Sequence, residues 1–260
     1  MYLPPNKRRQ GEGGLWTRGR FKNSNAGHPL LMIVTVVLND EAHIEDTILS
    51  VVTQDYENVQ YVVIDGRSTD GTVGIIKKYE HAIDYWVSEP DQGIYDAMNK
   101  GISLTLKDCL IIFINSGDKI IGNLLSGSIR GPSFLPVRYK NMFGREKKIR
   151  IKSQKYGLPN NHQGIIFLNK KIFYDLKYLV AADYDYFLRQ PTVEYKSVSD
   201  DEGYILYDNM SGYSQQNNWR GIFEIRMIML DNFGALHANL FYIKMVIKTC
   251  IKKCLYLFIY

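Results

Sequence analysis

The stretch LLMIVTVVLNDEAHIEDTILSVVTQ, residues 30–54, decides the fold class of this chain. Its first nine residues are apolar except for Thr35 and are rich in β-branched side chains, which is typical of a strand buried on both faces. The residues that follow place Ile44 and Ile48 at helical spacing, and Asn39 or Asp40 can cap that helix. A buried strand followed directly by an amphipathic helix predicts an α/β unit.

The alternation of strand and helix continues as far as Asn115. Buried strands are expected at 59–65, 82–88 and 109–115, and helices at 70–80 and 93–106. Strands joined in this way are parallel, because each crossover helix returns the chain to the same edge of the sheet. The sequence therefore predicts an α/β fold with a mostly parallel central sheet flanked by helices.

Polar clusters follow every one of these strands. Asn39 and Asp40 follow the first, and the segments DGRSTDGT, SEPDQG and NSGD follow the next three. Because the carboxyl ends of parallel strands meet at one edge of a sheet, these clusters are expected to surround one ligand site.

The secondary structure outside residues 30–115 is less clear from the sequence. Residues 119–160 carry no clear pattern, and the later elements are expected to complete the same domain with a mixed sheet. Strands are expected at 164–169, 193–199 and 203–208, and helices at 170–176 and 182–190. Residues 1–29 are rich in Gly, Asn, Lys and Arg and are interpreted as a disordered or loosely docked basic arm. The expected organisation is an arm at 1–29, a main domain at 30–215 and a helical segment at 216–260.

The composition narrows the class of protein. The 260 residues are 45% apolar and 23% charged, which is ordinary for a globular chain. The net charge of +5 lies largely at the two ends, so a nucleic-acid binder, with basic residues along one face, is not indicated. Three cysteines without a pairing framework favour a reducing compartment. The first residues lack the apolar region of a secretory signal, and no uncharged apolar run reaches the length of about 18 residues that spans a bilayer.

Two carboxylates at the expected site suggest its chemistry, namely Asp65 in VIDGRSTDGT and Asp118 in NSGD. A carboxylate on such a loop can hold a hard divalent cation, which in turn holds phosphate oxygens. Neither a P-loop nor a dinucleotide-binding glycine motif is present. A nucleotide diphosphate with Mg²⁺ or Mn²⁺ is therefore the natural ligand, although DGRSTDGT taken alone is also compatible with a simple turn and helix cap.

Five segments together resemble a known family. They are residues 33–72 and the segments SEPDQGIYDAMNKGI, FINSGD, NHQGIIF and AADYDYFLR. In order and spacing they are similar to family 2 glycosyltransferases of the inverting GT-A type. The nearest resemblance is to bacterial enzymes of extracellular polysaccharide, colanic acid, capsule or O-antigen synthesis, and it covers roughly residues 30–215. It implies a GT-A catalytic domain and metal-dependent transfer of a sugar from a nucleotide-diphosphate donor to a hydroxyl of a glycan acceptor, which is often lipid-linked.

The resemblance also implies roles for individual residues. Asp65 matches the aspartate that contacts the nucleotide base, and Asn99 matches an asparagine of the nucleotide-side helix. Asn115 and Asp118 begin and end the segment that matches the family's DxD motif, so that Asp118 reaches the metal. Asp183 matches the aspartate of the ED motif, which acts as general base in an inverting displacement. Donor contacts are assigned to Val36, Asn39, Asp65, Asp91, Asn99 and Asn115.

Other residues compete for these roles. Asp185 is the rival general base, but it lies about 200° from Asp183 around a helix, so only one of the two can face the site. His162 in NHQG is a candidate to touch the metal, the diphosphate or the acceptor, with a structural role as its alternative. Asp96 is a candidate donor contact or a solvated helix position.

The chain departs from the family's pattern at several of these positions. Asn115 and Gly117 replace acidic residues, and Ala182 replaces the glutamate of the ED motif. These losses motivate an alternative function, a non-catalytic sugar-nucleotide-binding subunit of a polysaccharide assembly complex. A nucleotidyltransferase is disfavoured because LNDEAH after the first strand is acidic, where such enzymes carry a basic, glycine-rich loop.

The end of the chain, NLFYIKMVIKTCIKKCLYLFIY at 239–260, has an amphipathic pattern. Lys244, Lys248 and Lys252 are spaced four apart and share one helical stripe among large apolar residues. Such a helix suits a membrane interface with anionic head groups, and its alternative is packing against the main domain or a second subunit. The sequence thus predicts a cytoplasmic protein that is peripheral at the inner face of the cell membrane.

Overall fold

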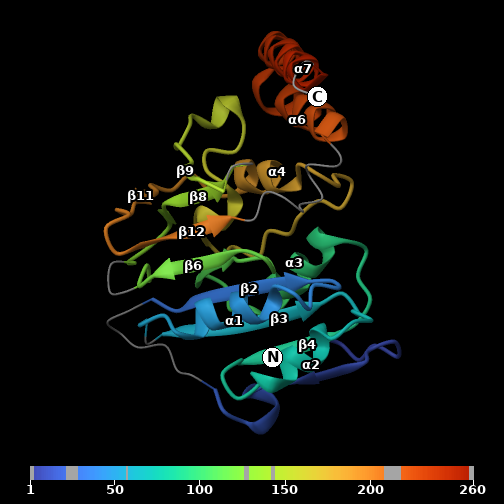
Figure 1. Cartoon of the computed structure of the whole chain (residues 1–260), viewed down its shortest axis with the longest axis vertical. Coiled ribbons are helices and arrows are strands. Elements are labelled where there is room, and N and C mark those ends of the chain that lie inside the picture. Colours follow the sequence, from blue (N-terminus) through green and yellow to red (C-terminus); the bar gives the residue numbers. More distant parts are fainter. Residues whose placement is uncertain are drawn as a thin grey trace.

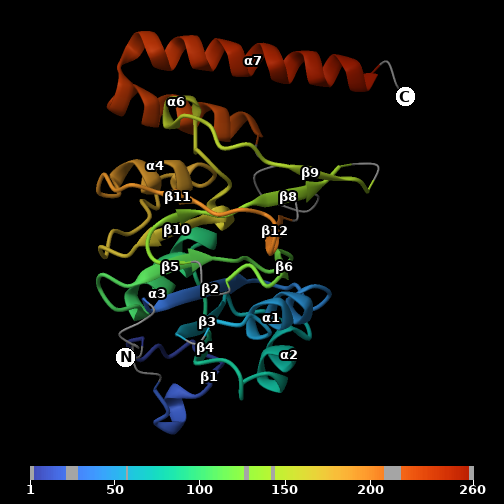
Figure 2. The same cartoon turned by 90° about the vertical axis from the view of Figure 1, so that its left-hand side faces the viewer.

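The computed structural model describes residues 3–21, 29–56, 58–125, 129–141, 144–207 and 218–257. Its main feature is an eight-stranded mixed sheet with the strand order β1-β4-β3-β2-β5-β10-β7-β11 (Figures 1 and 2). The strands are β1 (Gly11–Gly13), β2 (Leu31–Val37), β3 (Val59–Asp65), β4 (Tyr85–Ser88), β5 (Leu110–Phe113), β7 (Ser133–Phe134), β10 (Ile165–Leu168) and β11 (Lys196–Ser197).

The parallel centre of this sheet is the part predicted from the sequence. Strands β4, β3, β2 and β5 are parallel, with Leu31 opposite Val59 on one side and Leu110 on the other. They are connected by α1 (Ile44–Val52), α2 (Thr72–Lys78) and α3 (Ile94–Leu104). Strands β1, β10 and β7 are each antiparallel to an inner neighbour, so the sheet as a whole is mixed.

Two apolar clusters lie on the two faces of the sheet, because alternate side chains of a strand point to opposite sides. On β2, Met32 and Val34 belong to the cluster that includes α3 and α4 (Ala182–Arg189). Leu31 and Ile33 belong to the cluster that α1 and α2 cover. Burial on both faces explains why the strand is a continuous apolar run.

A second sheet of four strands arises mostly from the segment without a clear sequence pattern. Its order is β6-β12-β8-β9, with β6 (Lys119–Gly122), β8 (Val137–Lys140), β9 (Glu146–Lys148) and β12 (Gly203–Tyr207). These strands have three to five residues, too few to show a reliable period. Strand β6 begins directly after Asp118, so this carboxylate lies where the chain passes from one sheet to the other.

The expectation of a disordered or loosely docked arm at 1–29 is wrong for residues 3–21. Strand β1 pairs antiparallel with β4, and the short helix η1 (Trp16–Arg18) buries Trp16 completely. The Trp16 ring stacks on Tyr85 with a centroid separation of 5.8 Å. Glycine permits this pairing, because a Cβ at Gly13 would lie 2.5 Å from Nε1 of Trp86. Residues 1–2 and 22–28 of the arm lie outside the described residues.

Two local expectations in the second half are also wrong. Residues 170–176 form no helix; both ends of the Asn99 amide bind the backbone of Tyr174, with Tyr174 N–H donating to Oδ1 at 2.7 Å. These bonds replace helical ones, and Lys171 has a left-handed backbone with φ 58°. The strand expected at 193–199 contracts to β11, whereas those expected at 164–169 and 203–208 correspond to β10 and β12.

The C-terminal helices form a hairpin at one end of the long axis (Figures 1 and 2). Helix α6 (Asn218–Phe233) and α7 (Ala235–Leu257) are separated by Gly234, whose φ of 81° suits glycine. His237 contacts the backbone carbonyl of Lys155 at 2.7 Å and thereby joins the hairpin to the short helix η2 (Gln154–Tyr156), which precedes the short helix η3 (His162–Gly164). Within the described residues, no helix has both the length and the apolarity needed to cross a membrane.

Candidate active site

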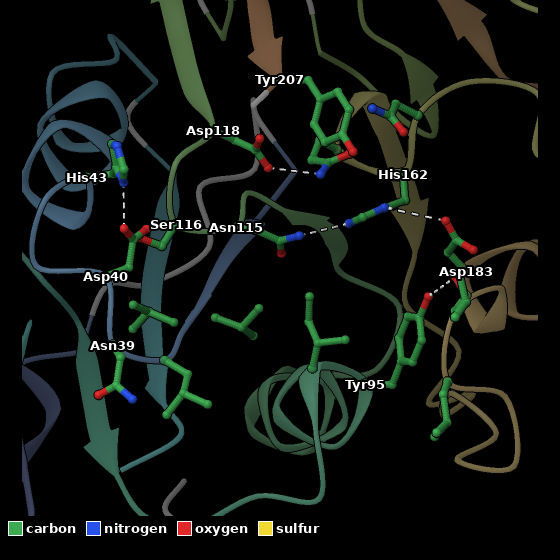
Figure 3. A pocket seen from close by; sticks show the side chains of 18 residues that line it. Asn39, Asp40, His43, Tyr95, Asn115, Ser116, Asp118, His162, Asp183 and Tyr207 are labelled. Carbon is green, nitrogen blue, oxygen red and sulfur yellow. Dashed lines mark hydrogen bonds and ion pairs between the residues drawn. The ribbon is translucent and has the colours of Figure 1, made fainter. Parts of the chain in front are cut away.

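A cavity of about 410 Å³ opens beyond the carboxyl ends of β2 and β5, where the polar clusters were expected to meet (Figure 3). Of the residues proposed from the sequence, it is lined by Val36, Asn39, Asn115, Asp118, His162 and Asp183. Residues from widely separated parts of the sequence thus meet at one edge of the sheet, as the topology requires.

The loop after β5 is held rigidly with Asp118 at its end. The hydroxyl of Thr47 donates to the carbonyl of Asp118 at 2.9 Å and accepts from the N–H of Gly117 at 3.1 Å. Gly117 has a φ of 94°, which glycine adopts without strain. One threonine on α1 therefore fixes both sides of the turn that carries the carboxylate.

Asp118 is buried, with 2% of its surface exposed. Its Oδ2 accepts a hydrogen bond of 2.9 Å from Nε2 of Gln163 in η3. On the other side of the loop, Ser116 donates to Asp40 at 2.6 Å, and Asp40 contacts His43 at 2.6 Å. A chain of polar side chains thus connects the loop to the start of α1.

The candidate ligands for a hard divalent cation are Asp118 and two amide oxygens of the same cavity. The buried side-chain oxygens of Asn115 and Gln163 make no hydrogen bond with any described residue. Within the same ranges, no three His, Cys, Asp or Glu side chains group as a cation site. The protein therefore offers one carboxylate and neutral amide oxygens, a donor set of the type that Mg²⁺ and Mn²⁺ accept when a ligand supplies the remaining oxygens.

Across the cavity, His162 connects the loop that carries Asp118 to Asp183, and Figure 3 shows the side chains of Asn115, His162 and Asp183 in a row. Nδ2 of Asn115 lies 3.2 Å from Nε2 of His162, and Nδ1 of His162 lies 3.6 Å from Oδ2 of Asp183. An amide nitrogen only donates, so Nε2 is the acceptor and a neutral imidazole carries its proton on Nδ1, facing Asp183.

The segment before Asp183 is clamped from two sides. The hydroxyl of Tyr95 on α3 donates to the carbonyl of Val180 at 2.8 Å. From α6, the carboxylate of Glu224 accepts the backbone N–H groups of residues 179–181 at 2.8–3.0 Å. Burial opposes ionisation of Glu224, but the hydrogen bonds from Arg220 and from these backbone groups hold its pKa below the usual range.

The two candidate bases on α4 have different surroundings. Asp183 lines the cavity, and its Oδ1 accepts the N–H of Tyr184 at 2.8 Å. Asp185 lies outside the cavity and pairs with Arg189 at 2.7 Å. Asp183 is therefore the carboxylate of this helix that an acceptor in the cavity can reach.

A second cavity of about 460 Å³ adjoins the first along Val36, Leu38 and Tyr95. It brings in Asp91 from the loop before α3 and Asp96 from the first turn of that helix. Burial, together with the nearby carboxylates of Asp96 and Asp65, raises the pKa of Asp91. The two cavities give the site an extended shape with an apolar floor.

Two donor contacts expected from the sequence lie elsewhere. Asp65 is fully buried and lines neither cavity; its carboxylate accepts from the backbone of Arg67 and Ser68 and from the hydroxyl of Ser88. It shapes the loop that carries Gly66, where a Cβ would lie 2.6 Å from Oδ2 of Asp91. Asn99 is also outside both cavities and binds the backbone of Tyr174, as described above.

Sequence reasoning missed several residues that line the first cavity, namely Asp40, His43, Tyr95, Gln163 and Tyr207. Asp40 was placed in a polar cluster at the expected site and as a helix cap, but it was given no role of its own. Gln163 stands beside His162 in NHQG, so the polar character of that short segment was a usable signal. Tyr207 comes from β12, and nothing in its local sequence indicates that the second sheet reaches this cavity.

Comparison with known proteins identifies the family. The profile of the family described as "Glycosyl transferase family 2" matches residues 32–121. An uncharacterized glycosyltransferase of Mycobacterium tuberculosis (strain CDC 1551 / Oshkosh) is 30% identical over 184 residues, 64% of this chain and 70% of that protein. The putative teichuronic acid biosynthesis glycosyltransferase TuaG of Bacillus subtilis (strain 168) is 32% identical over 94 residues, 35% of this chain and 37% of that protein.

Solved structures agree on the fold. S. aureus TarS has a TM-score of 0.59 at 17% identity, covering 84% of this chain and 43% of that chain. The mannosyltransferase PcManGT from Pyrobaculum calidifontis, in complex with GDP-Man and Mn²⁺, has a TM-score of 0.58 at 13% identity, covering 84% and 70%. These likenesses confirm the expected GT-A fold and, with the sequence matches, show that the chain belongs to glycosyl transferase family 2 and is a glycosyltransferase.

Proposed function

We propose that the protein is a metal-dependent, inverting glycosyltransferase that moves a sugar from a nucleotide-diphosphate donor to a hydroxyl of a glycan acceptor. The observation that carries this proposal is that Asp118 and Asp183 line one cavity, and that a side-chain row from Asn115, in the loop that ends at Asp118, leads through His162 to Asp183. One carboxylate is thereby available to the leaving diphosphate and the other to the attacking hydroxyl.

The donor is placed along the two joined cavities. Its diphosphate lies at Asp118, and its nucleoside extends along Val36, Asn39 and the second cavity towards Asp91. GDP-Man bound to PcManGT supports a nucleotide-diphosphate sugar as the class of donor. Asp65 is proposed to act indirectly, by fixing the loop with Gly66 beside Asp91.

The proposed cofactor is Mg²⁺ or Mn²⁺, and the residues that would hold it are Asp118 with the amide oxygens of Asn115 and Gln163. When bound, the cation would supply charge neutralisation to the departing diphosphate. The rigid turn at Thr47 keeps the Asp118 carboxylate in place without the cost of ordering it on binding.

The proposed chemistry is a single displacement. The acceptor oxygen forms a bond to the anomeric carbon while the bond from that carbon to the diphosphate oxygen breaks, and its electron pair leaves with the nucleotide diphosphate. Asp183 accepts the proton of the acceptor hydroxyl. His162 is proposed to orient Asp183 towards the cavity by the contact of 3.6 Å between Nδ1 and Oδ2.

The proposed setting is surface polysaccharide synthesis at the inner face of the cell membrane. TuaG, named for teichuronic acid biosynthesis, supports a polysaccharide product. On α7, Leu236, Leu240, Ile243 and Ile247 are 53–78% exposed and form one stripe, because they are spaced by three or four residues. Lys244 and Lys248 flank this stripe and complement anionic head groups, so we propose that α7 lies on the bilayer surface.

The decisive experiment incubates the purified chain with a panel of UDP-, GDP- and dTDP-sugars, with Mn²⁺, with Mg²⁺ or with EDTA, and measures binding and release of nucleotide diphosphate. We expect one donor class to bind and to release its diphosphate in a cation-dependent way, and Asp183→Asn to bind that donor without transfer. Binding without turnover by the natural chain in the presence of a glycan acceptor mixture would instead indicate a non-catalytic subunit. Absence of binding to every donor would overturn the proposal.

A further inference from the structure

The N-terminal segment at 3–21 reaches the edge of the large sheet where the two cavities open. Strand β1 is antiparallel to β4, with Gly11 opposite Ser88 at the carboxyl end of β4 (Figure 2). The N–H of Gln10 continues this pairing and donates to the carbonyl of Ser88 at 2.8 Å. Since ligands of such a sheet bind beyond the carboxyl ends of its parallel strands, the residues directly before β1 lie at the ligand edge.

Arg9 is the charged residue of this segment that is most firmly held there. Its side chain is 12% exposed, and its Nε donates to Oε2 of Glu89 at 2.9 Å. The two terminal nitrogens donate to the carboxylate of Glu12 at 2.8 Å and to the carbonyl of Pro4 at 2.7 Å. A planar guanidinium bound to three partners has a fixed position, so Arg9 joins β1 and the residues before it to the chain that follows β4.

Glu89 is the first residue of a loop at 89–93, which forms one wall of the second cavity. Asp91, Gln92 and Gly93 line that cavity, whereas Glu89 itself is buried behind it. The N–H of Glu89 donates to the carbonyl of Asp65 at 3.0 Å, which ties the loop to the end of β3. The position of Glu89 therefore sets where the cavity wall begins.

Two cations balance the buried carboxylate of Glu89. Besides Arg9, Nζ of Lys100 on α3 lies 3.2 Å from Oε1 of Glu89 and also donates to the carbonyl of Pro90 at 2.7 Å. Burial opposes ionisation of Glu89, but Arg9 and Lys100 hold its pKa below the usual range. A buried carboxylate that loses one of its cations is strongly unfavourable, so without Arg9 the loop must shift or the carboxyl must take up a proton.

The same segment contains a second arginine–glutamate pair, which provides a comparison. Arg18 pairs with Glu80, and both side chains are more exposed than those of Arg9 and Glu89. Glu80 precedes β4 in the chain, whereas Glu89 follows it and begins the cavity wall. The two pairs thus attach one segment to the main domain at different places, and the pair of Arg9 is the one connected to the candidate active site.

We propose that the N-terminal segment is part of the donor site, and that Arg9 is a positioning residue that acts through Glu89 on the 89–93 loop. The inference rests on the function proposed above, which places the nucleoside of the donor along this loop and its diphosphate at Asp118 in the first cavity. Loss of Arg9 therefore weakens the contacts of the nucleoside and leaves those of the diphosphate in place. The segment lies ahead of residues 32–121, the part that matches the family profile, so it is an addition of this chain to the matched region.

The test measures the affinity of the full chain for UDP, GDP and dTDP by isothermal titration in the presence of Mg²⁺. Inorganic pyrophosphate is the ligand without a nucleoside. Arg9→Gln removes the guanidinium, and Arg9→Lys keeps the charge with fewer hydrogen bonds. Arg18→Gln is the matched control, because it removes an arginine from a pair with glutamate in the same segment. Thermal unfolding of every variant sets a titration temperature at which all of them are folded.

We expect Arg9→Gln to weaken the affinity for the nucleotide that the natural chain binds best by about tenfold, since the loop is no longer held ready for the nucleoside. Pyrophosphate affinity should not change, Arg9→Lys should recover part of the loss, and Arg18→Gln should equal the natural chain. Equal nucleotide affinity in Arg9→Gln and Arg18→Gln would overturn the proposal. So would equal losses for nucleotide and pyrophosphate in Arg9→Gln, because these would indicate a general structural role.

A second variant covers the case in which Arg9→Gln does not fold. Lys100→Gln removes the other cation of Glu89 from α3, and it should show the same selective loss of nucleotide affinity. Unchanged nucleotide affinity in Lys100→Gln would then overturn the proposal. Nucleotide binding that does not respond to Arg9 refutes this inference alone, whereas absence of nucleotide binding by the natural chain refutes the proposed function.

Discussion

Nδ1 of His162 lies 3.6 Å from Oδ2 of Asp183, and the opposite ring nitrogen contacts the amide of Asn115. The imidazole therefore joins the side of the cavity that carries Asp118 to the side that carries the proposed base. A histidine that orients a neighbouring carboxylate changes the position of that carboxylate, and it has a smaller effect on substrate affinity. This relationship allows the roles of the two residues to be separated by experiment.

Asp183→Asn is expected to lower the transfer rate by about 10²–10⁴-fold, because the amide cannot accept the proton of the acceptor hydroxyl. Donor affinity should not change. The matched variant is Asp185→Asn, which should retain transfer but lose up to about 1 kcal/mol of unfolding free energy, since it weakens the partly exposed pair with Arg189. Steady-state kinetics and thermal unfolding measure both. Equal activity losses in the two variants would contradict the assignment.

His162→Ala is expected to lower kcat by about tenfold or more with little change in KM for the donor, since it removes the group that orients Asp183. His162→Asn, whose amide nitrogen can replace the Nδ1–H donor, should recover part of the loss. The measurement is a comparison of kcat and KM for the three proteins. A rise in donor KM alone, with kcat preserved, would place His162 on the donor instead.

Asp118→Asn is expected to weaken Mn²⁺ binding in the presence of nucleotide diphosphate by about tenfold or more, because it removes the carboxylate of the proposed cation site. Electron paramagnetic resonance of free Mn²⁺ gives the affinity directly. The control is Asp46→Asn on the exposed side of α1, which pairs with Lys119. Unchanged Mn²⁺ affinity in Asp118→Asn would remove this residue from the cation site.

Glu224→Gln is expected to reduce stability in a pH-dependent manner. The folded pKa of Glu224 lies below its ordinary value of 4.5, so its stabilisation is fully present above that pH and is lost as the pH falls through the folded pKa. At pH 7 the variant should lose about 1–3 kcal/mol. Below pH 4.5, urea unfolding should show the two proteins converging. A constant difference across the acid range would show that the carboxylate charge is not the cause.

Leu240→Ser combined with Ile243→Ser is expected to reduce binding to vesicles containing phosphatidylglycerol, since both side chains belong to the exposed stripe of α7. Binding of the natural chain should weaken as salt increases, because the lysines of α7 add an electrostatic contribution. Vesicle sedimentation measures both effects. Phe223→Ser on α6, exposed but outside the stripe, is the control, and the proposal fails if it has the same effect as the double variant.

The parallel half of the fold was predictable because each element has a strong local pattern. Leu31 to Val37 form a buried strand, and their continuous apolar run predicts such a strand without ambiguity. Ile44 and Ile48 indicate the helix that covers it. Asp118 and Asp183 were assigned to the predicted site because motifs carry them, and both line the first cavity. By contrast, β1 depends on pairing with β4, and the strands of the second sheet are too short to be recognised alone. The orientation of Asp65, turned to Ser68 and Ser88, depends on tertiary hydrogen bonds that no local pattern contains.

The pairing of β1 with β4 also bears on whether copies of the large sheet can pair edge to edge. An open sheet invites another chain to add a strand at its rim, and long uncovered rims favour polymerisation. Here one rim is the three-residue, glycine-rich β1, and the other is the two-residue β11, which begins with the exposed Lys196. Both rims of the large sheet are thus too short to template a fibril, and the N-terminal segment acts as a built-in guard for the longer and more apolar strand behind it.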